Sequence, residues 1–133
     1  VDLLASRPEV DASRIHAFGR GAAATAVLHA AVLDSRIRST ALENMLVSYQ
    51  SVADYKIHLQ VFEQVVPGVL RDYDLPGLVR SLAPRKVWIV DARDPLGQAV
   101  ALDEVRKQYQ SGTVSVVRRH SHDSSATLFH FED

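Results

Sequence analysis

Short apolar runs alternate along this chain with longer amphipathic or alanine-rich segments, and polar or turn-forming residues separate them. A short continuous apolar run is typical of a strand that is buried on both faces of a parallel sheet. Such runs occur at residues 15–18, 37–42, 87–90 and 113–117. The spacing of apolar and small residues between them predicts helices at residues 22–33, 75–82 and 98–110.

Capping residues mark the ends of two predicted helices. Asp74 is a good N-cap for the helix at residues 75–82, and Gly112 is placed to end the helix at residues 98–110. Apolar side chains at near-helical spacing predict a further helix at residues 54–66, and the preceding residues 48–53 read as a loop. The last apolar stretch, residues 126–131, predicts one more strand that returns as a hairpin.

This order of strands and helices predicts an α/β fold. Strands that alternate with helices favour a three-layer sandwich, with a mainly parallel sheet of four to five strands and helices on both faces. The 133 residues suit a single domain with one sizeable core. Val1-Asp2-Leu3-Leu4 reads as the inside of a helix, so we expect the chain to be the C-terminal part of a longer protein.

Composition narrows the classes of function. The formal net charge of −1 gives no basic surface that would recruit nucleic acid or an anionic membrane. No apolar run reaches the ~18 residues that a membrane-spanning helix needs. The absence of cysteine excludes disulfides, thiolate metal sites and a cysteine nucleophile. The lack of cysteine does not indicate a cellular compartment.

Candidate chemistry begins at the glycine turn that follows the first predicted strand. Gly19-Arg20-Gly21-Ala22-Ala23-Ala24 fits the dinucleotide pattern G-x-G-x-x-A between a strand and a helix. Glu43, near the end of the next strand, falls where an acid would bind a ribose hydroxyl. Gly19, Gly21 and Glu43 are therefore candidate cofactor-binding residues. Small-residue turns also occur wherever a strand and a helix pack closely.

The same turn fits a second template, the nucleophile elbow G-x-S-x-G. Gly19 then takes the first glycine position, Gly21 the nucleophile position, and Ala23 the last glycine position. Glycine suits the unusual backbone of such a turn, but it supplies no oxygen that could attack an ester carbonyl.

Three segments resemble bacterial α/β-hydrolases, and in particular the acetyl xylan esterase branch of the carbohydrate esterases. They are the turn with its flanks (residues 14–19 and 34–37), the run at residues 73–87, and the loop Asp91-Ala92-Arg93-Asp94-Pro95-Leu96-Gly97. The resemblance covers nearly the whole chain but only the C-terminal half of a complete hydrolase domain. It implies that Asp94 holds the triad acid position and His122, or alternatively His120, the base position. It also implies that the nucleophile is lost at Gly21 and that one oxyanion donor lies upstream of this sequence.

We therefore expect a degenerate, non-catalytic hydrolase module with a structural or partner-supporting role. The alternatives are a nucleotide- or dinucleotide-binding module that uses Gly19 to Ala24, or part of an active serine-type carbohydrate esterase whose nucleophile lies elsewhere. The strand at residues 15–18 would be an exposed apolar edge, suited to self-association or to an adjacent domain of the parent protein. Asp94-Pro95 is also a common turn opener, and the polar run from His120 to Asp123 reads as solvated loop. We expect no metal and no cofactor.

Overall fold

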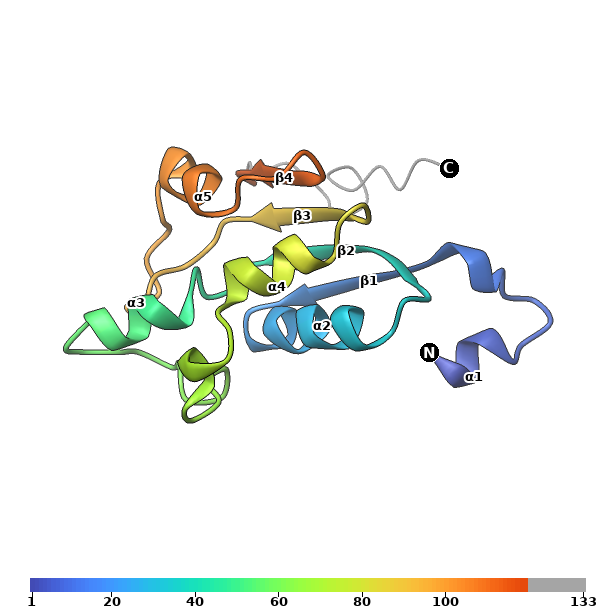
Figure 1. The fold of residues 1–133 in the computed structure, drawn as a ribbon, viewed down its shortest axis with the longest axis horizontal. Coiled ribbons are helices and arrows are strands. Elements are labelled where there is room, and N and C mark those ends of the chain that lie inside the picture. The colour runs from blue at the N-terminus through green and yellow to red at the C-terminus, as the bar shows by residue number, and fades with distance from the viewer. Residues whose placement is uncertain (120–133) are drawn as a thin grey trace.

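Figure 1 shows the computed structural model of the chain, which describes residues 1–119. Its strands form one parallel sheet in the order β1-β2-β3-β4, so that each strand pairs with the next one in sequence. The strands are β1 (Ile15–Arg20), β2 (Ile37–Glu43), β3 (Lys86–Val90) and β4 (Val114–Val117). The predicted α/β fold is therefore present, as a four-stranded parallel sheet with helices around it. The predicted strand at residues 126–131 lies outside the described residues.

Helices form the connections between successive strands, as parallel pairing requires. Helix α2 (Ala22–Leu33) joins β1 to β2, packs against both and also contacts α4 (Leu75–Ser81), which precedes β3. Helix α5 (Leu102–Gln108) joins β3 to β4, while α1 (Asp2–Ala5) and the 3₁₀ turn η1 (Ala12–Arg14) precede β1. No helix of the described part is both long and apolar enough to cross a membrane.

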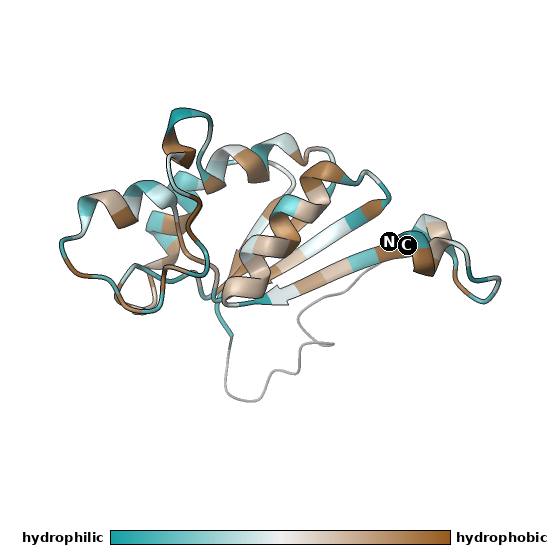
Figure 2. Cartoon of the chain, turned by 90° about the horizontal axis from the view of Figure 1, so that it is seen from below, coloured by the Kyte–Doolittle hydropathy of each residue, from teal (hydrophilic) through white to brown (hydrophobic). Residues whose placement is uncertain are grey.

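The core explains why the strands read as continuous apolar runs. Alternate residues of a strand point to opposite faces of the sheet, and here both faces carry apolar side chains. The larger cluster contains Leu28 of α2, Leu42 and Ile89, and a smaller one contains Ala41 and Val90. Figure 2 shows this as apolar residues along the strands and along α2.

The prediction for residues 48–66 is wrong. Residues 48–53 were expected as a loop, but Tyr49–Asp54 form helix α3, and the expected helix at residues 54–66 is irregular chain instead. The Ser48 side chain accepts a hydrogen bond from the Ser51 amide and caps α3 at its start. The Asp74 carboxylate accepts hydrogen bonds from the amides at positions 49 and 50. The helix therefore begins earlier than the apolar spacing suggested.

The helix before β4 is also shorter than predicted. It begins at Leu102 and ends at Gln108, with Tyr109 as its C-cap, so Gly112 does not cap it. Asp94 holds the preceding residues in a turn, because its Oδ1 atom accepts hydrogen bonds from the Leu96 and Gln98 amides. The predicted N-cap role of Asp74 is confirmed by its hydrogen bond from the Leu75 amide.

Residues 49–73 form a lobe that comprises α3, irregular chain at residues 55–68 and the 3₁₀ turn η2 (Val69–Arg71). In Figure 1 this lobe lies at the carboxyl end of the sheet, where the arrowheads of the strands point. Ligands of open parallel sheets bind at this end. The lobe therefore borders the place where a functional site is expected.

Candidate functional site

The turn between β1 and α2 has the geometry of a sharp strand-to-helix elbow. Gly21 separates Arg20, the last residue of β1, from Ala22, the first of α2, with φ of 60° and ψ of −130°. Its amide donates to the Glu43 carbonyl over 2.8 Å, and its carbonyl accepts from the Ala24 amide over 3.0 Å. The turn is thus tied to the end of β2 on one side and to the first turn of α2 on the other.

The two glycines of the turn are required for different reasons. A Cβ atom at Gly19 would lie 2.5 Å from the Ala23 carbonyl oxygen and 2.6 Å from the Ala24 Cα atom. Both atoms belong to the backbone of α2, so Gly19 is fixed by the close approach of strand and helix. At Gly21 a Cβ atom would meet nothing within 4 Å, and only the positive φ disfavours a side chain. A side chain at Gly21 would therefore project into open space.

Gly21 lines a small cavity at the carboxyl end of the sheet, and Asp94 lines the same cavity. Its volume is about 170 Å³, and both residues line it. Asn44, which follows β2, and Gln64 of the lobe also line it. The predicted nucleophile position and the predicted acid position thus line the same cavity, although they are 73 positions apart in sequence.

The Asp94 side chain serves a structural purpose in this arrangement. Its Oδ1 atom accepts hydrogen bonds from the Leu96 amide over 2.9 Å and from the Gln98 amide over 2.8 Å. These two hydrogen bonds agree with the interpretation of Asp94-Pro95 as residues that open a turn. The base candidates His120 and His122 lie outside the described residues, and no histidine of residues 1–119 lines the cavity.

Asn44 and Arg93 complete the wall of the cavity and were not predicted as site residues. Asn44 has a positive φ of 52° directly after β2, and its amide donates to the Val90 carbonyl over 2.8 Å. The Arg93 Nε atom donates to the Asn44 Oδ1 atom over 3.1 Å. Both residues are polar and lie within three residues of the end of a predicted strand, and that position could have marked them as candidates.

Glu43 is placed differently from what a dinucleotide site needs. Its side chain is 2% exposed, and its Oε1 atom lies 2.6 Å from an Arg119 nitrogen and 3.6 Å from the Arg20 Nε atom. A carboxylate that is buried against arginines is not available to a ribose. Dinucleotides also bind where the strand order of a sheet reverses, and the described strands run in sequential order. Gly19, Gly21 and Glu43 therefore lack the surroundings that the dinucleotide alternative needs.

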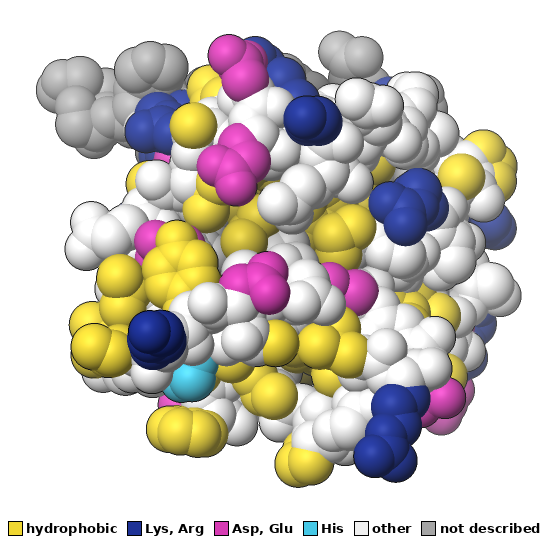
Figure 3. Space-filling model, turned by 60° about the vertical axis from the view of Figure 1, so that its left-hand side comes forward, with side chains coloured by type: hydrophobic (Ala, Val, Ile, Leu, Met, Phe, Trp, Pro, Cys, Tyr) yellow, Lys and Arg dark blue, Asp and Glu magenta, His cyan; other side chains and the backbone are white. Residues whose placement is uncertain are grey.

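A second cavity lies on the other side of the Asp94 loop, between α3, α4 and α5, and has a volume of about 520 Å³. Asp54, Asp74, Asp94 and Glu104 line it, and none of its lining residues is lysine, arginine or histidine. Figure 3 shows acidic side chains around the hollow on this side of the molecule. This negative surface disfavours a phosphate-bearing ligand at the carboxyl end of the sheet. Within residues 1–119, no three histidine or acidic side chains are grouped so that they could hold a metal ion.

No model of a known protein family matches this chain, and no curated protein matches it in sequence. The likeness to α/β-hydrolases therefore stays a prediction. The structural features that bear on function are the glycine turn, the cavity of about 170 Å³ that Gly21 lines, and the other residues of its wall.

Proposed function

We propose that this chain is a degenerate, non-catalytic α/β-hydrolase-like module that resembles the C-terminal half of an acetyl xylan esterase domain. The supporting observation is the position of Gly21. Gly21 lies in a strand-to-helix turn, lines the cavity that Asp94 also lines, and carries no reactive atom at the position that the resemblance assigns to the nucleophile.

The surroundings of Gly21 support this proposal in two further ways. The tight packing at Gly19 keeps the shape of the turn whether or not chemistry takes place there. The cavity of about 170 Å³ is smaller than the ~300–1,000 Å³ that is usual for a small-molecule site. The turn thus retains the architecture of an elbow without a nucleophile and without room for a sizeable substrate.

Hydrolysis of p-nitrophenyl acetate tests the loss of activity. We expect the protein and its Asp94→Ala variant to release p-nitrophenol at the same rate, because no residue at the Gly21 position can form an acyl intermediate. Gly21→Ser should add no turnover, because by the hydrolase resemblance one oxyanion donor comes from a loop that these 133 residues do not include. Asp103→Ala, at an exposed acid on α5, is the matched control for removal of one carboxylate. Turnover that Asp94→Ala abolishes and Asp103→Ala preserves would overturn the proposal.

The partner-supporting role is proposed for strand β1. Within the described sheet, β1 lies at one edge and pairs with β2 alone. An edge strand offers backbone donors and acceptors to another chain, and edges left open favour association. We propose that residues 15–18, from Ile15 to Phe18, pair with a second copy or with an adjacent domain of the parent protein.

Sedimentation velocity over a concentration series tests this role of β1. We expect the sedimentation coefficient to rise with concentration, and the amides of β1 to become more protected from hydrogen exchange as it rises. The amides of β3, which lie between two strands, are an internal control that should not change. A monomer at every concentration, with constant exchange at β1, would exclude self-association through this edge.

A further inference from the structure

The two faces of the sheet bury their apolar side chains against different elements. Leu42 of β2 and Ile89 of β3 belong with Leu28 of α2 to the larger apolar cluster. Every buried apolar residue of the described helices is part of that cluster. Figure 2 shows helices on the upper side of the strands. The described helices therefore bury their apolar residues on one side of the sheet.

The opposite face carries the smaller cluster, and strand residues alone form it. Ala41 and Val90 are its buried members, and Trp88 and Val117 pack against them. The strand register places Phe18 of β1 beside Ala41, and Phe18 is 45% exposed. We call the surface formed by these five residues the Trp88 face. Parallel sheets are almost always covered on both faces, so this face needs a cover that the described helices do not supply.

The last described residue, Arg119, lies on the Trp88 face. Glu43 of β2 is next to Val90 in the strand register, so its side chain points to the same face as that of Val90. The Arg119 Nη1 atom donates to the Glu43 Oε1 atom over 2.6 Å, and the Arg119 amide donates to the Asp91 Oδ2 atom over 3.3 Å. Because β3 lies between β4 and β2, this arginine reaches back across the sheet. The chain therefore continues from this face, at the carboxyl ends of the strands.

The sequence that follows Arg119 has the length and the composition of a cover. Residues 120–133 lie outside the described part, and they begin with six polar residues, 120–125. An apolar run follows at residues 126–131, with Leu128, Phe129 and Phe131. Six extended residues span about 20 Å, whereas four strands spaced ~4.8 Å apart lie within about 14 Å. The apolar run can therefore reach every strand of the Trp88 face.

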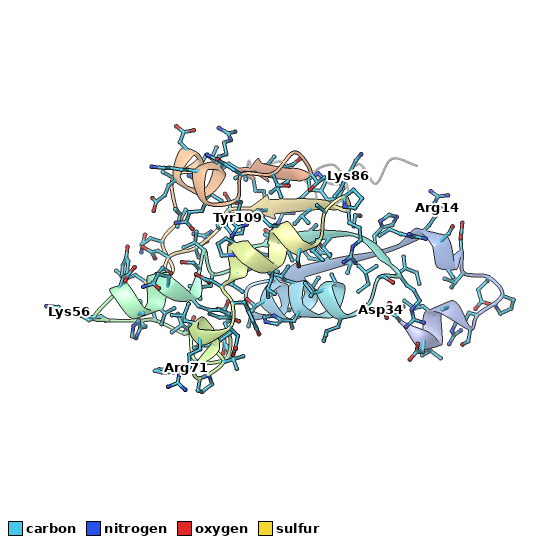
Figure 4. The ribbon with its side chains drawn as sticks, viewed as in Figure 1. Arg14, Asp34, Lys56, Arg71, Lys86 and Tyr109 are labelled. Carbon is cyan, nitrogen blue, oxygen red and sulfur yellow. The ribbon has the colours of Figure 1, made fainter. Side chains whose placement is uncertain are left out.

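Charge complementarity indicates the direction of the run. Lys86 is exposed at the start of β3, two residues before Trp88, and Arg14 directly precedes β1. Figure 4 shows both residues at the end of the sheet where the strands begin. Glu132 and Asp133 follow the apolar run in sequence. A run that starts at the carboxyl ends of the strands and follows the sheet back would bring these two carboxylates towards the basic side chains.

We propose that residues 126–131 pack on the Trp88 face of the same chain and cover it. The contact removes the rings of Phe129, Phe131 and Trp88 from water. The bond between Arg119 and Glu43 holds the start of this segment at the carboxyl ends of the strands. A face that its own chain covers is closed to partners, which leaves them the edge of the sheet at β1. The cover is independent of any chemistry at Gly21.

Fluorescence of Trp88, the one tryptophan of the chain, tests the proposal in the full-length protein. Phe129→Ser combined with Phe131→Ser should shift the Trp88 emission to longer wavelength and increase its quenching by acrylamide, because water then reaches the indole ring. Ile57→Ser combined with Phe62→Ser is the matched control. These two side chains of the lobe are 69% and 86% exposed, so their loss should leave the emission unchanged. Unaltered circular dichroism of both double variants ensures that the emission reports on the cover.

Nuclear Overhauser effects in the unaltered protein locate the run without any substitution. We expect contacts between the Trp88 ring and the rings of Phe129 and Phe131, and in a mixture of labelled and unlabelled protein these contacts should arise within one chain. Three results would overturn the proposal. One is an emission of Trp88 that the change at Phe129 and Phe131 leaves unaltered. Another is contacts of residues 126–131 with the backbone of β4 alone, as a hairpin at that edge would give. The third is contacts between labelled and unlabelled chains, which would make a second copy the cover.

Discussion

The glycine turn and the lobe both border the carboxyl end of the sheet, but they differ in what fixes their shape. The turn is set by contacts between neighbouring residues, because the α2 backbone at Ala23 and Ala24 leaves no room for a side chain at Gly19. The lobe is set by contacts that are distant in sequence. Asp74 holds the first amides of α3, and His29 of α2 bonds to the Tyr73 hydroxyl over 3.0 Å.

The two regions also differ in their polar groups. Gly21, which takes the nucleophile position in the proposed hydrolase resemblance, has no side chain. The lobe contains a buried hydroxyl, at Tyr49, without a hydrogen-bond partner in the described structure. Packing fixes the shape of the turn, whereas an unpaired polar group is a cost to stability.

The largest expected effect concerns the turn. Gly19→Ala should lower the free energy of unfolding by roughly 3 kcal/mol, because its Cβ atom would overlap backbone atoms that cannot move aside. Gly21→Ala should cost less, about 1–2 kcal/mol, since it introduces strain at positive φ but no overlap. Urea denaturation of the purified variants measures both changes.

Gly77→Ala is the matched control for this pair. Gly77 lies within α4, and the atom nearest to an added Cβ there is the end of the Arg80 side chain, 4.0 Å away. We expect this substitution to be neutral or to stabilise the protein by up to about 1 kcal/mol, because alanine favours helix. If Gly19→Ala were no more costly than Gly21→Ala, the turn would not owe its shape to the contact with α2.

The same difference between local and distant contacts explains what the sequence could predict. The strands and α2 were predicted closely, because continuous apolar runs and small residues report local burial. The hydrolase resemblance implied that Gly21 and Asp94 lie near each other. Both line one cavity in the structure, because both follow parallel strands whose carboxyl ends share one edge of the sheet. The helix expected at residues 54–66 is absent, and Ile57 and Phe62 are 69% and 86% exposed. The Asp74 carboxylate that captures the start of α3 is twenty-five residues from Tyr49, so no local pattern reveals it.

The unpaired hydroxyl of Tyr49 was missed for a related reason, because in the sequence Tyr49 looks like any tyrosine. Only the structure distinguishes it from Tyr109, which is equally buried but donates its hydroxyl to the Val47 carbonyl over 2.6 Å. Burial raises the pKa of both phenols, yet one is bonded and the other is not.

The smallest expected effect compares these two tyrosines. Tyr109→Phe should lower the free energy of unfolding by roughly 1–2 kcal/mol, because it leaves the buried Val47 carbonyl without its donor. Tyr49→Phe should instead raise it by about 1 kcal/mol, because it removes a buried hydroxyl that has no partner. Urea denaturation without ligand measures both, and the two variants control each other, since each removes one phenol oxygen from a buried ring. A loss of stability in Tyr49→Phe equal to that in Tyr109→Phe would mean that the Tyr49 hydroxyl is bonded within the fold. A gain would show that the Tyr49 oxygen contributes nothing to the stability of the fold.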